Sequence, residues 1–171
     1  MDASVIENVL NGREGVSIAN YNCPGQIVIT GEAAAVAEAG TALKEAGARR
    51  VLPLKVSGPF HSPMMRPAGE ELAKVFARVS MNPLKIPYVA NINAEVITDC
   101  GRIEGLLVEQ VSGSVRWQQS VETMIREGVD TFVEIGPGKT LTGFLRKIDK
   151  NVKAYHIGSW EEAVQVCEEL K

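Results

Sequence analysis

The hydrophobic pattern of the chain changes repeatedly between the period of a helix and that of a strand, and this alternation limits the possible folds more than any other feature. The first third predicts helix, strand, strand, helix and strand, at residues 2–11, 16–20, 26–30, 32–46 and 50–56. A ferredoxin-like βαββαβ module has the same order with one further strand at its start. The order therefore suggests a truncated ferredoxin-like module.

The pattern changes after a predicted loop at 57–65. The remaining elements are predicted as helix, strand, two helices, strand, helix, strand and helix, at 66–79, 87–92, 102–111, 116–127, 131–135, 138–148, 152–157 and 160–170. Alternating strands and helices are typical of an α/β protein with a largely parallel sheet covered by helices. No low-complexity linker is present, so we expect the two parts to join directly near residue 57.

Charge and composition exclude several classes of partner. The net charge is −3 and the pI is about 5.5, which argues against a nucleic-acid surface. No apolar run is long enough to cross a membrane. The three cysteines match no zinc or redox spacing, and an odd, sparse set is typical of reduced thiols in the cytoplasm. With two histidines in the chain, we expect no histidine-rich metal site.

His61 is the candidate catalytic residue. It lies in Ser57-Gly-Pro-Phe-His-Ser-Pro-Met-Met65, immediately after a predicted strand, and loops at strand ends carry catalytic groups in α/β proteins. Histidine is the natural general base near neutral pH. The alternative is a loop histidine that is bonded to the backbone. His156, inside a predicted strand, is expected to be a sheet-edge or surface residue.

A histidine base needs a nucleophile, and the elbow motif Gly-x-Ser-x-Gly is absent from the chain. The nearest approach contains Ser17, which lies in a predicted strand and is interpreted as structural. Cys23 is a further candidate, but no cationic neighbour in the sequence lowers its pKa. A hydrolase that uses Cys23 with His61 therefore stays as an alternative hypothesis.

Two loops remain open to more than one interpretation. Asn20, Asn22 and Gln26 surround a Cys-Pro-Gly turn, where Asn and Gly favour turns for backbone reasons, although uncharged amides also suit a pantetheine arm. The Gly-Pro-Gly-Lys-Thr segment at 136–140 fails the spacing of both the Walker loop and the dinucleotide fingerprint. It is either a structural turn or a positive helix end that faces an anion.

Taken in order, these segments resemble the malonyl-CoA:acyl carrier protein transacylases of fatty acid synthesis. The resemblance covers nearly the whole chain and is carried by residues 20–31, 47–50, 57–65, 115–117 and 133–141. It implies an α/β-hydrolase-like large domain with an inserted ferredoxin-like subdomain. On this reading residues 1–57 are the ferredoxin-like subdomain without its first strand, and residues 58–171 are the C-terminal portion of the large domain.

The resemblance also implies an activity. A serine attacks the malonyl thioester of malonyl-CoA, and the malonyl group then passes to the phosphopantetheine thiol of acyl carrier protein, with no cofactor. His61 matches the general base of both steps, Gln110 matches the residue whose backbone carbonyl orients it, and Phe60 matches a residue that faces the acyl pocket. In this reading Asn20, Asn22 and Gln26 are candidates for substrate binding.

The departures from the family pattern are as important as the matches. The family's elbow serine, its malonyl-binding arginine and its oxyanion-hole glutamine precede the matched region, and Arg49, Arg50 and Arg66 do not match that arginine. The resemblance therefore implies the C-terminal part of an acyltransferase, inactive until an N-terminal half completes it. The alternative is a non-catalytic module that binds a carrier protein or a pantetheine chain.

Overall fold

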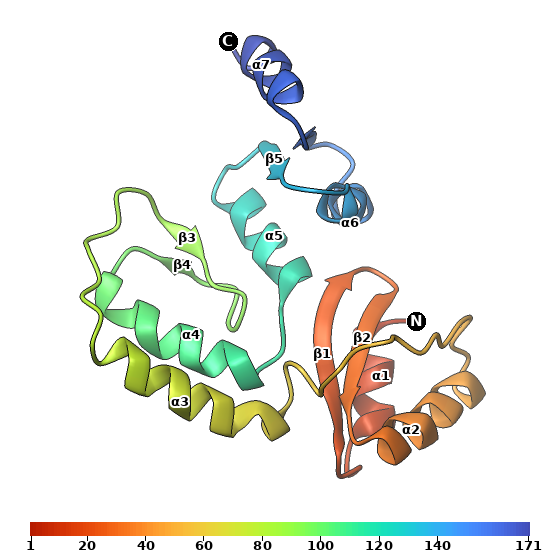
Figure 1. Cartoon of the computed structure of the whole chain (residues 1–171). Coiled ribbons are helices and arrows are strands. Elements are labelled where there is room, and N and C mark those ends of the chain that lie inside the picture. The colour runs from red at the N-terminus through yellow and green to blue at the C-terminus, as the bar shows by residue number, and fades with distance from the viewer.

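A computed structural model describes all 171 residues, and Figure 1 shows helices and short strand pairs following one another along the chain. The helices are α1 (Ala3–Leu10), α2 (Ala33–Glu45), α3 (Arg66–Phe76), α4 (Ile103–Ser112), α5 (Trp117–Arg126), α6 (Thr140–Ile148) and α7 (Trp160–Glu169), with 3-10 turns at Pro63–Met65 and Cys100–Arg102. The strands are β1 (Val16–Cys23), β2 (Gln26–Gly31), β3 (Tyr88–Val89), β4 (Val96–Ile97), β5 (Thr131–Ile135) and β6 (Lys153–Ile157). The predicted α/β class is confirmed.

The strands form three separate pairs. β1–β2 and β3–β4 are antiparallel, and β5–β6 is parallel with α6 as the crossover between its strands. The prediction of a largely parallel sheet therefore holds for β5–β6 alone. In the other two pairs the loop between the strands is too short for a crossover, since parallel neighbours need a connection of a dozen or more residues.

The first unit is a hairpin covered on one face by two helices. Its core consists of Ile6, Leu10, Ile18, Tyr21, Ala39 and Leu43, contributed by α1, β1 and α2. Helical spacing places Ile6 and Leu10 on one face of α1, and Figure 1 shows α1 and α2 on the same side of the hairpin. The turn of the hairpin contains Gly25 at φ +77°, a conformation that favours glycine.

The predicted strand at 50–56 does not form. This segment is drawn as coil in Figure 1, and Leu52, Leu54 and Val56 are 71%, 61% and 65% exposed. A strand requires a hydrogen-bonded neighbour, and in a βαββαβ arrangement the last strand pairs with the first. This sequence contains no such first strand, so residues 50–56 have the apolar pattern of a strand but no neighbouring strand to form hydrogen bonds with. Residues 1–57 therefore form a two-stranded hairpin with two helices, and the ferredoxin-like subdomain stays a prediction.

Helices α3 and α4 pack closely and bring the loop that precedes α3 beside the end of α4. A Cβ on Gly69 of α3 would lie 3.0 Å from the backbone oxygen of Val108 on α4, so the observed approach depends on a glycine. The same packing sets the Pro63–Met65 turn against α4. Two residues before this turn lies His61.

Strand β1 joins the first unit to the segment that follows α4. Ser114 Oγ donates to Ile18 O at 2.5 Å, Tyr21 N donates to Val115 O at 2.8 Å, and Val115 N donates to Ala19 O at 2.7 Å. The two parts predicted from the sequence are therefore connected by backbone hydrogen bonds as well as by the chain. No helix of the structure is both long and apolar enough to cross a membrane.

Candidate functional site

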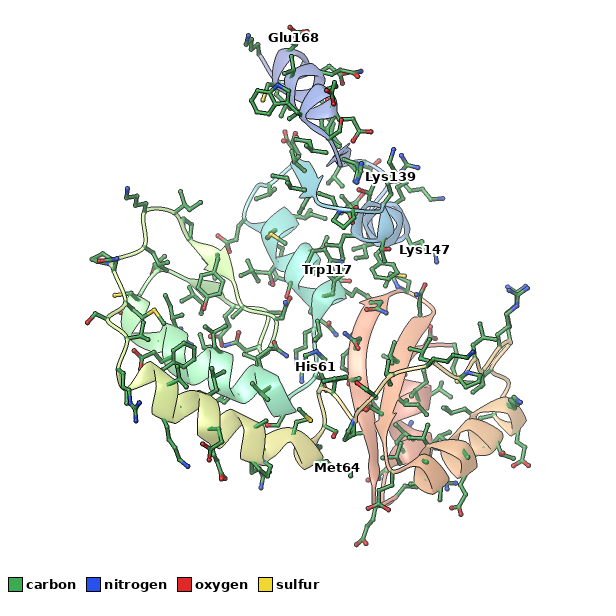
Figure 2. The ribbon with its side chains drawn as sticks, viewed as in Figure 1. His61, Met64, Trp117, Lys139, Lys147 and Glu168 are labelled. Carbon is green, nitrogen blue, oxygen red and sulfur yellow. The ribbon has the colours of Figure 1, made fainter.

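His61 adopts an unusual backbone conformation in a tight turn. Its φ is +58°, and Ala94 is the other non-glycine residue with a positive φ. Left-handed backbone is uncommon for residues other than glycine and is found where the surrounding structure holds it in place. Figure 2 shows His61 where the β1–β2 hairpin and the ends of α4 and α5 come together.

The imidazole of His61 is bonded to a backbone carbonyl. Its Nδ1 lies 3.1 Å from Gln110 O, across 49 residues of sequence. A carbonyl oxygen only accepts hydrogen bonds, so Nδ1 carries the proton and donates it. Nε2 then keeps its lone pair and is free to take up a proton from a nucleophile.

The carbonyl of Gln110 is available because it lies in the last turn of α4, which ends at Ser112. The last backbone hydrogen bond of this helix runs from Gly113 N to Glu109 O at 2.9 Å. The amide of Ser114, the next residue, does not donate to Gln110 O, so this carbonyl has no partner in the helix. The Gln110 side chain holds the end of the helix, since Nε2 donates to Gly113 O at 3.0 Å and to Ser114 O at 3.4 Å. A helix terminus therefore supplies the acceptor for the histidine.

The other predicted site residues lie in two places. Phe60 is in the same turn as His61 and is 48% exposed. Asn20 and Asn22 are half-buried on β1, and Asn20 forms a bridge with Val115, which follows the α4 terminus. Neither asparagine side chain has a hydrogen-bond partner within the chain.

Gln26 lies away from this group, at the turn of the β1–β2 hairpin against α6. It is exposed, and its Oε1 accepts a hydrogen bond from Lys147 at 3.3 Å and one from the thiol of Cys23 at 3.9 Å. No contact links Gln26 to His61. The structure thus brings together His61, Phe60 and Gln110, and it engages Gln26 elsewhere.

The environment of Cys23 argues against a nucleophilic role. The residue is 1% exposed. Burial raises the pKa of its thiol, and the nearby Lys147 ammonium, which lowers the pKa, does not offset this effect. The cation is distant in sequence and becomes a neighbour only through the fold. Because the thiolate is the reactive form, the hypothesis of a hydrolase based on Cys23 and His61 loses support.

The Gly-Pro-Gly turn at 136–138 does not present a free anion site. The carboxylate of Glu134 accepts hydrogen bonds from Leu141 N at 3.0 Å, from Thr142 N at 2.7 Å and from Thr142 Oγ1 at 2.6 Å. Burial alone would raise the pKa of Glu134, but the bonds from Thr142 and Leu141, together with His156, hold it below the ordinary range. The start of α6 is therefore occupied by the protein's own carboxylate, which favours the structural interpretation of the turn.

His156 is more enclosed than the sequence suggests. It lies on β6, whose one neighbouring strand is β5, yet its side chain is 10% exposed. Its Nε2 is 2.9 Å from Gly136 O, and its Nδ1 is 3.4 Å from a carboxylate oxygen of Glu162. The predicted sheet-edge position is confirmed, since β6 has β5 as its one neighbour, but the ring is not on the surface because the turn before α6 and the start of α7 cover it.

Ser62 is a polar residue of the site that the sequence does not single out. It is 1% exposed, and its hydroxyl donates to Pro59 O at 2.6 Å. A serine immediately before a proline that begins a helical turn is an ordinary N-cap pattern, so the residue carries no distinctive signal. Its nearly complete burial is visible only in the folded chain.

Comparison with known proteins places the chain in a family. The model of the acyl transferase domain matches residues 2–166. The malonyl CoA-acyl carrier protein transacylase of Bacillus subtilis is 41% identical over 175 residues, covering 100% of this chain and 55% of the relative. The chain thus spans about half the length of the curated relatives that it matches.

Solved structures agree with this assignment. The crystal structure of MCAT from Streptococcus pneumoniae aligns with a TM-score of 0.93 at 41% identity, over 99% of this chain and 56% of that one. A malonyl-transacylase in complex with a holo type II PKS acyl-carrier protein aligns with a TM-score of 0.89 at 37% identity, over 97% of this chain and 53% of the other. From the domain match and these relatives, we conclude that the chain belongs to the acyl transferase domain family, among relatives named malonyl-CoA:acyl carrier protein transacylases.

Proposed function

We propose that this chain contributes the general base to a malonyl-CoA:acyl carrier protein transacylase, and that His61 is that base. The observation that carries the proposal is the bond between His61 Nδ1 and Gln110 O at 3.1 Å. This bond leaves Nε2 as the proton acceptor and stabilises the imidazolium once it has formed. The carbonyl takes the part that a carboxylate plays in a Ser-His-Asp triad.

In the proposed reaction one base serves two transfers. Nε2 of His61 takes the proton of a serine hydroxyl while the serine oxygen attacks the malonyl thioester carbon, and the proton then passes to the departing coenzyme A sulfur. In the second half Nε2 takes the proton from the carrier-protein thiol, the sulfur attacks the serine ester, and the proton returns to the serine. Protons and acyl groups balance over the two steps, so we propose no cofactor.

The substrates are proposed from the relatives and from the residues beside His61. The matched proteins are named for malonyl-CoA and acyl carrier protein, and one was solved with a carrier protein bound. We propose that Phe60 lines the acyl pocket, where its ring leaves little room for a branched acyl group, a discrimination of about 1–3 kcal/mol for one methyl. The unpaired amides of Asn20 and Asn22 are proposed to bind the pantetheine arm.

The serine is proposed to come from residues outside this sequence. The chain contains no Gly-x-Ser-x-Gly elbow and spans about half the length of its relatives. Exposed apolar side chains at Leu52, Leu54 and Val56, and at Ile135 on β5, which is 77% exposed, support a further polypeptide packing against the segment 50–56 and β5. This polypeptide is either covalently continuous with the chain or a separate partner.

The test is intact mass spectrometry after incubation with malonyl-CoA. The chain is measured alone and after mixing with the N-terminal part of the Bacillus subtilis relative, which contains the residues that this chain does not match. We expect a malonyl adduct only in the mixture, its loss with His61→Ala, and its retention with His156→Gln as the matched histidine control. An adduct on the chain alone would show that the nucleophile has been misplaced.

A second candidate function is a binding module without chemistry. It is favoured by one observation, the two half-buried asparagines of β1 whose side chains have no partner in the chain. Isothermal titration with holo acyl carrier protein tests it. Binding that is weakened by changing Asn20 and Asn22 to Ala, in the absence of any acyl transfer by the reconstituted mixture, would favour the module over the transacylase.

A further inference from the structure

Ser62 is one of the most deeply buried polar residues of the chain and lies directly after the proposed base. It is 1% exposed, and its hydroxyl donates to Pro59 O at 2.6 Å. This bond spans the tight turn at Phe60 and His61 from one side to the other. A buried hydroxyl in such a place stabilises one conformation of the residues that it encloses.

The hydroxyl does not serve the helix that follows it. Ser62 is the N-cap of the Pro63–Met65 turn, a position where a serine oxygen normally accepts a bond from an amide two or three residues ahead. Its side chain accepts no such bond, and the amide of Met65 is bonded to the backbone oxygen of Ser62 at 2.9 Å. The hydroxyl points backward instead, to the residue two positions before His61.

The turn needs such a restraint because of the conformation of His61. A φ of +58° costs free energy for a residue with a Cβ, so the turn opens unless neighbouring contacts hold it. Opening the turn rotates the imidazole away from Gln110 O, the acceptor 3.1 Å from Nδ1. Once that bond is lost, no group in the chain selects the Nδ1–H tautomer over the other.

We propose that Ser62 is a positioning residue for His61. Its bond to Pro59 O closes the turn in the left-handed conformation, keeps Nδ1–H on Gln110 O, and thereby leaves Nε2 free to accept a proton. The inference rests on the proposed function only in calling His61 a base, because the effect of Ser62 on the imidazole is a property of this chain alone. Removing the hydroxyl is expected to lower the ratio of the Nδ1–H to the Nε2–H tautomer roughly fivefold, about the effect of one intramolecular hydrogen bond.

The experiment is nitrogen NMR of the 171-residue chain labelled at histidine. The chain has two histidines, so His156→Gln assigns the signals of His61 without further work. At about pH 8.5, above the ordinary histidine range, the shifts of the two ring nitrogens report the tautomer ratio directly. The ratio is compared among the wild type, Ser62→Ala and Ser120→Ala.

Ser120→Ala is the matched control. Ser120 is also 1% exposed, its hydroxyl has no hydrogen-bond partner, and it lies on α5 rather than in the histidine turn. We expect Ser62→Ala to shift the tautomer ratio of His61 and Ser120→Ala to leave it unchanged. If Ser62→Ala does not fold, as judged by circular dichroism, then Ser62→Cys keeps a weaker donor at the same position and is expected to give an intermediate ratio.

The outcomes separate this inference from the proposed function. An unchanged ratio in folded Ser62→Ala or Ser62→Cys overturns the positioning role, and so does an equal shift in Ser120→Ala. A shift in the Ser62 variants alone supports the role, whether or not the reconstituted mixture transfers malonyl. If the mixture is active, the role further requires a loss in kcat with little change in the KM for malonyl-CoA.

Discussion

Replacing Gly69 by alanine is the most direct test of the packing that sets His61 beside Gln110. In a helix interior the change from glycine to alanine ordinarily stabilises by about 1 kcal/mol. At Gly69 the new Cβ lies 3.0 Å from the backbone oxygen of Val108, so α3 and α4 must separate by a few tenths of an ångström. Overpacking of this kind costs about 1–3 kcal/mol, so we expect Gly69→Ala to lower the free energy of unfolding by about 0–2 kcal/mol.

Gly105→Ala on α4 provides the matched comparison. A Cβ at Gly105 meets no atom within 4 Å, so this variant should show only the helix-propensity gain of about 1 kcal/mol. Urea unfolding of both variants measures the difference, expected to be about 1–3 kcal/mol in favour of Gly105→Ala. In the reconstituted transfer assay Gly69→Ala alone should be slow. Equal stabilisation of the two variants would refute the argument, since it would mean that α3 and α4 separate without cost.

Three further predictions concern ionisable groups. Because the pKa of Glu134 is lowered in the folded protein, its ionised form stabilises the fold at pH values above the pKa of an unfolded glutamate, about 4.3. The higher melting temperature of the wild type relative to Glu134→Gln should therefore disappear as the pH falls through the pKa of the folded state. Burial, with the bond to Glu7, raises the pKa of Tyr21 to about 12, so the melting temperature of the wild type should fall as the pH rises above about 10. Tyr21→Phe should lose less stability over this range, and a loss equal to that of the wild type would contradict the prediction. A thiol reagent should modify exposed Cys167 rapidly and buried Cys23 only after urea is added, as peptide mass mapping would show.

The helices and several strands follow from sequence patterns because their causes are local. The strand predicted at 131–135 is β5, and the helix predicted at 32–46 is α2 with one further residue at each end. Side-chain periodicity and glycines at helix ends act over a few residues, so they can be read without tertiary information. The absence of a serine elbow is equally a property of the sequence.

The strand predicted at 50–56 shows where this reasoning fails. Its alternating apolar residues carry the strand pattern, but a strand exists only when another backbone donates and accepts its hydrogen bonds. The strand predicted at 87–92 contains β3, which is only two residues long, whereas its partner β4 is not predicted because two residues are too few for a period to be recognised. Pairing is a relation between distant segments, and a pattern within one segment does not contain it.

The sequence by itself determined the α/β class and the absence of a Gly-x-Ser-x-Gly elbow and, through family resemblance, it indicated His61 and Gln110 as candidates. Only the tertiary structure decided that Gln110 O lies 3.1 Å from His61 Nδ1, that Glu134 occupies the start of α6, and that Ser62 donates backward to Pro59. The physical reason is that a polar group acquires its partner when folding removes water from around it. Which groups then meet depends on the packing of α3 on α4 and of β1 beside the end of α4, rather than on any short stretch of residues.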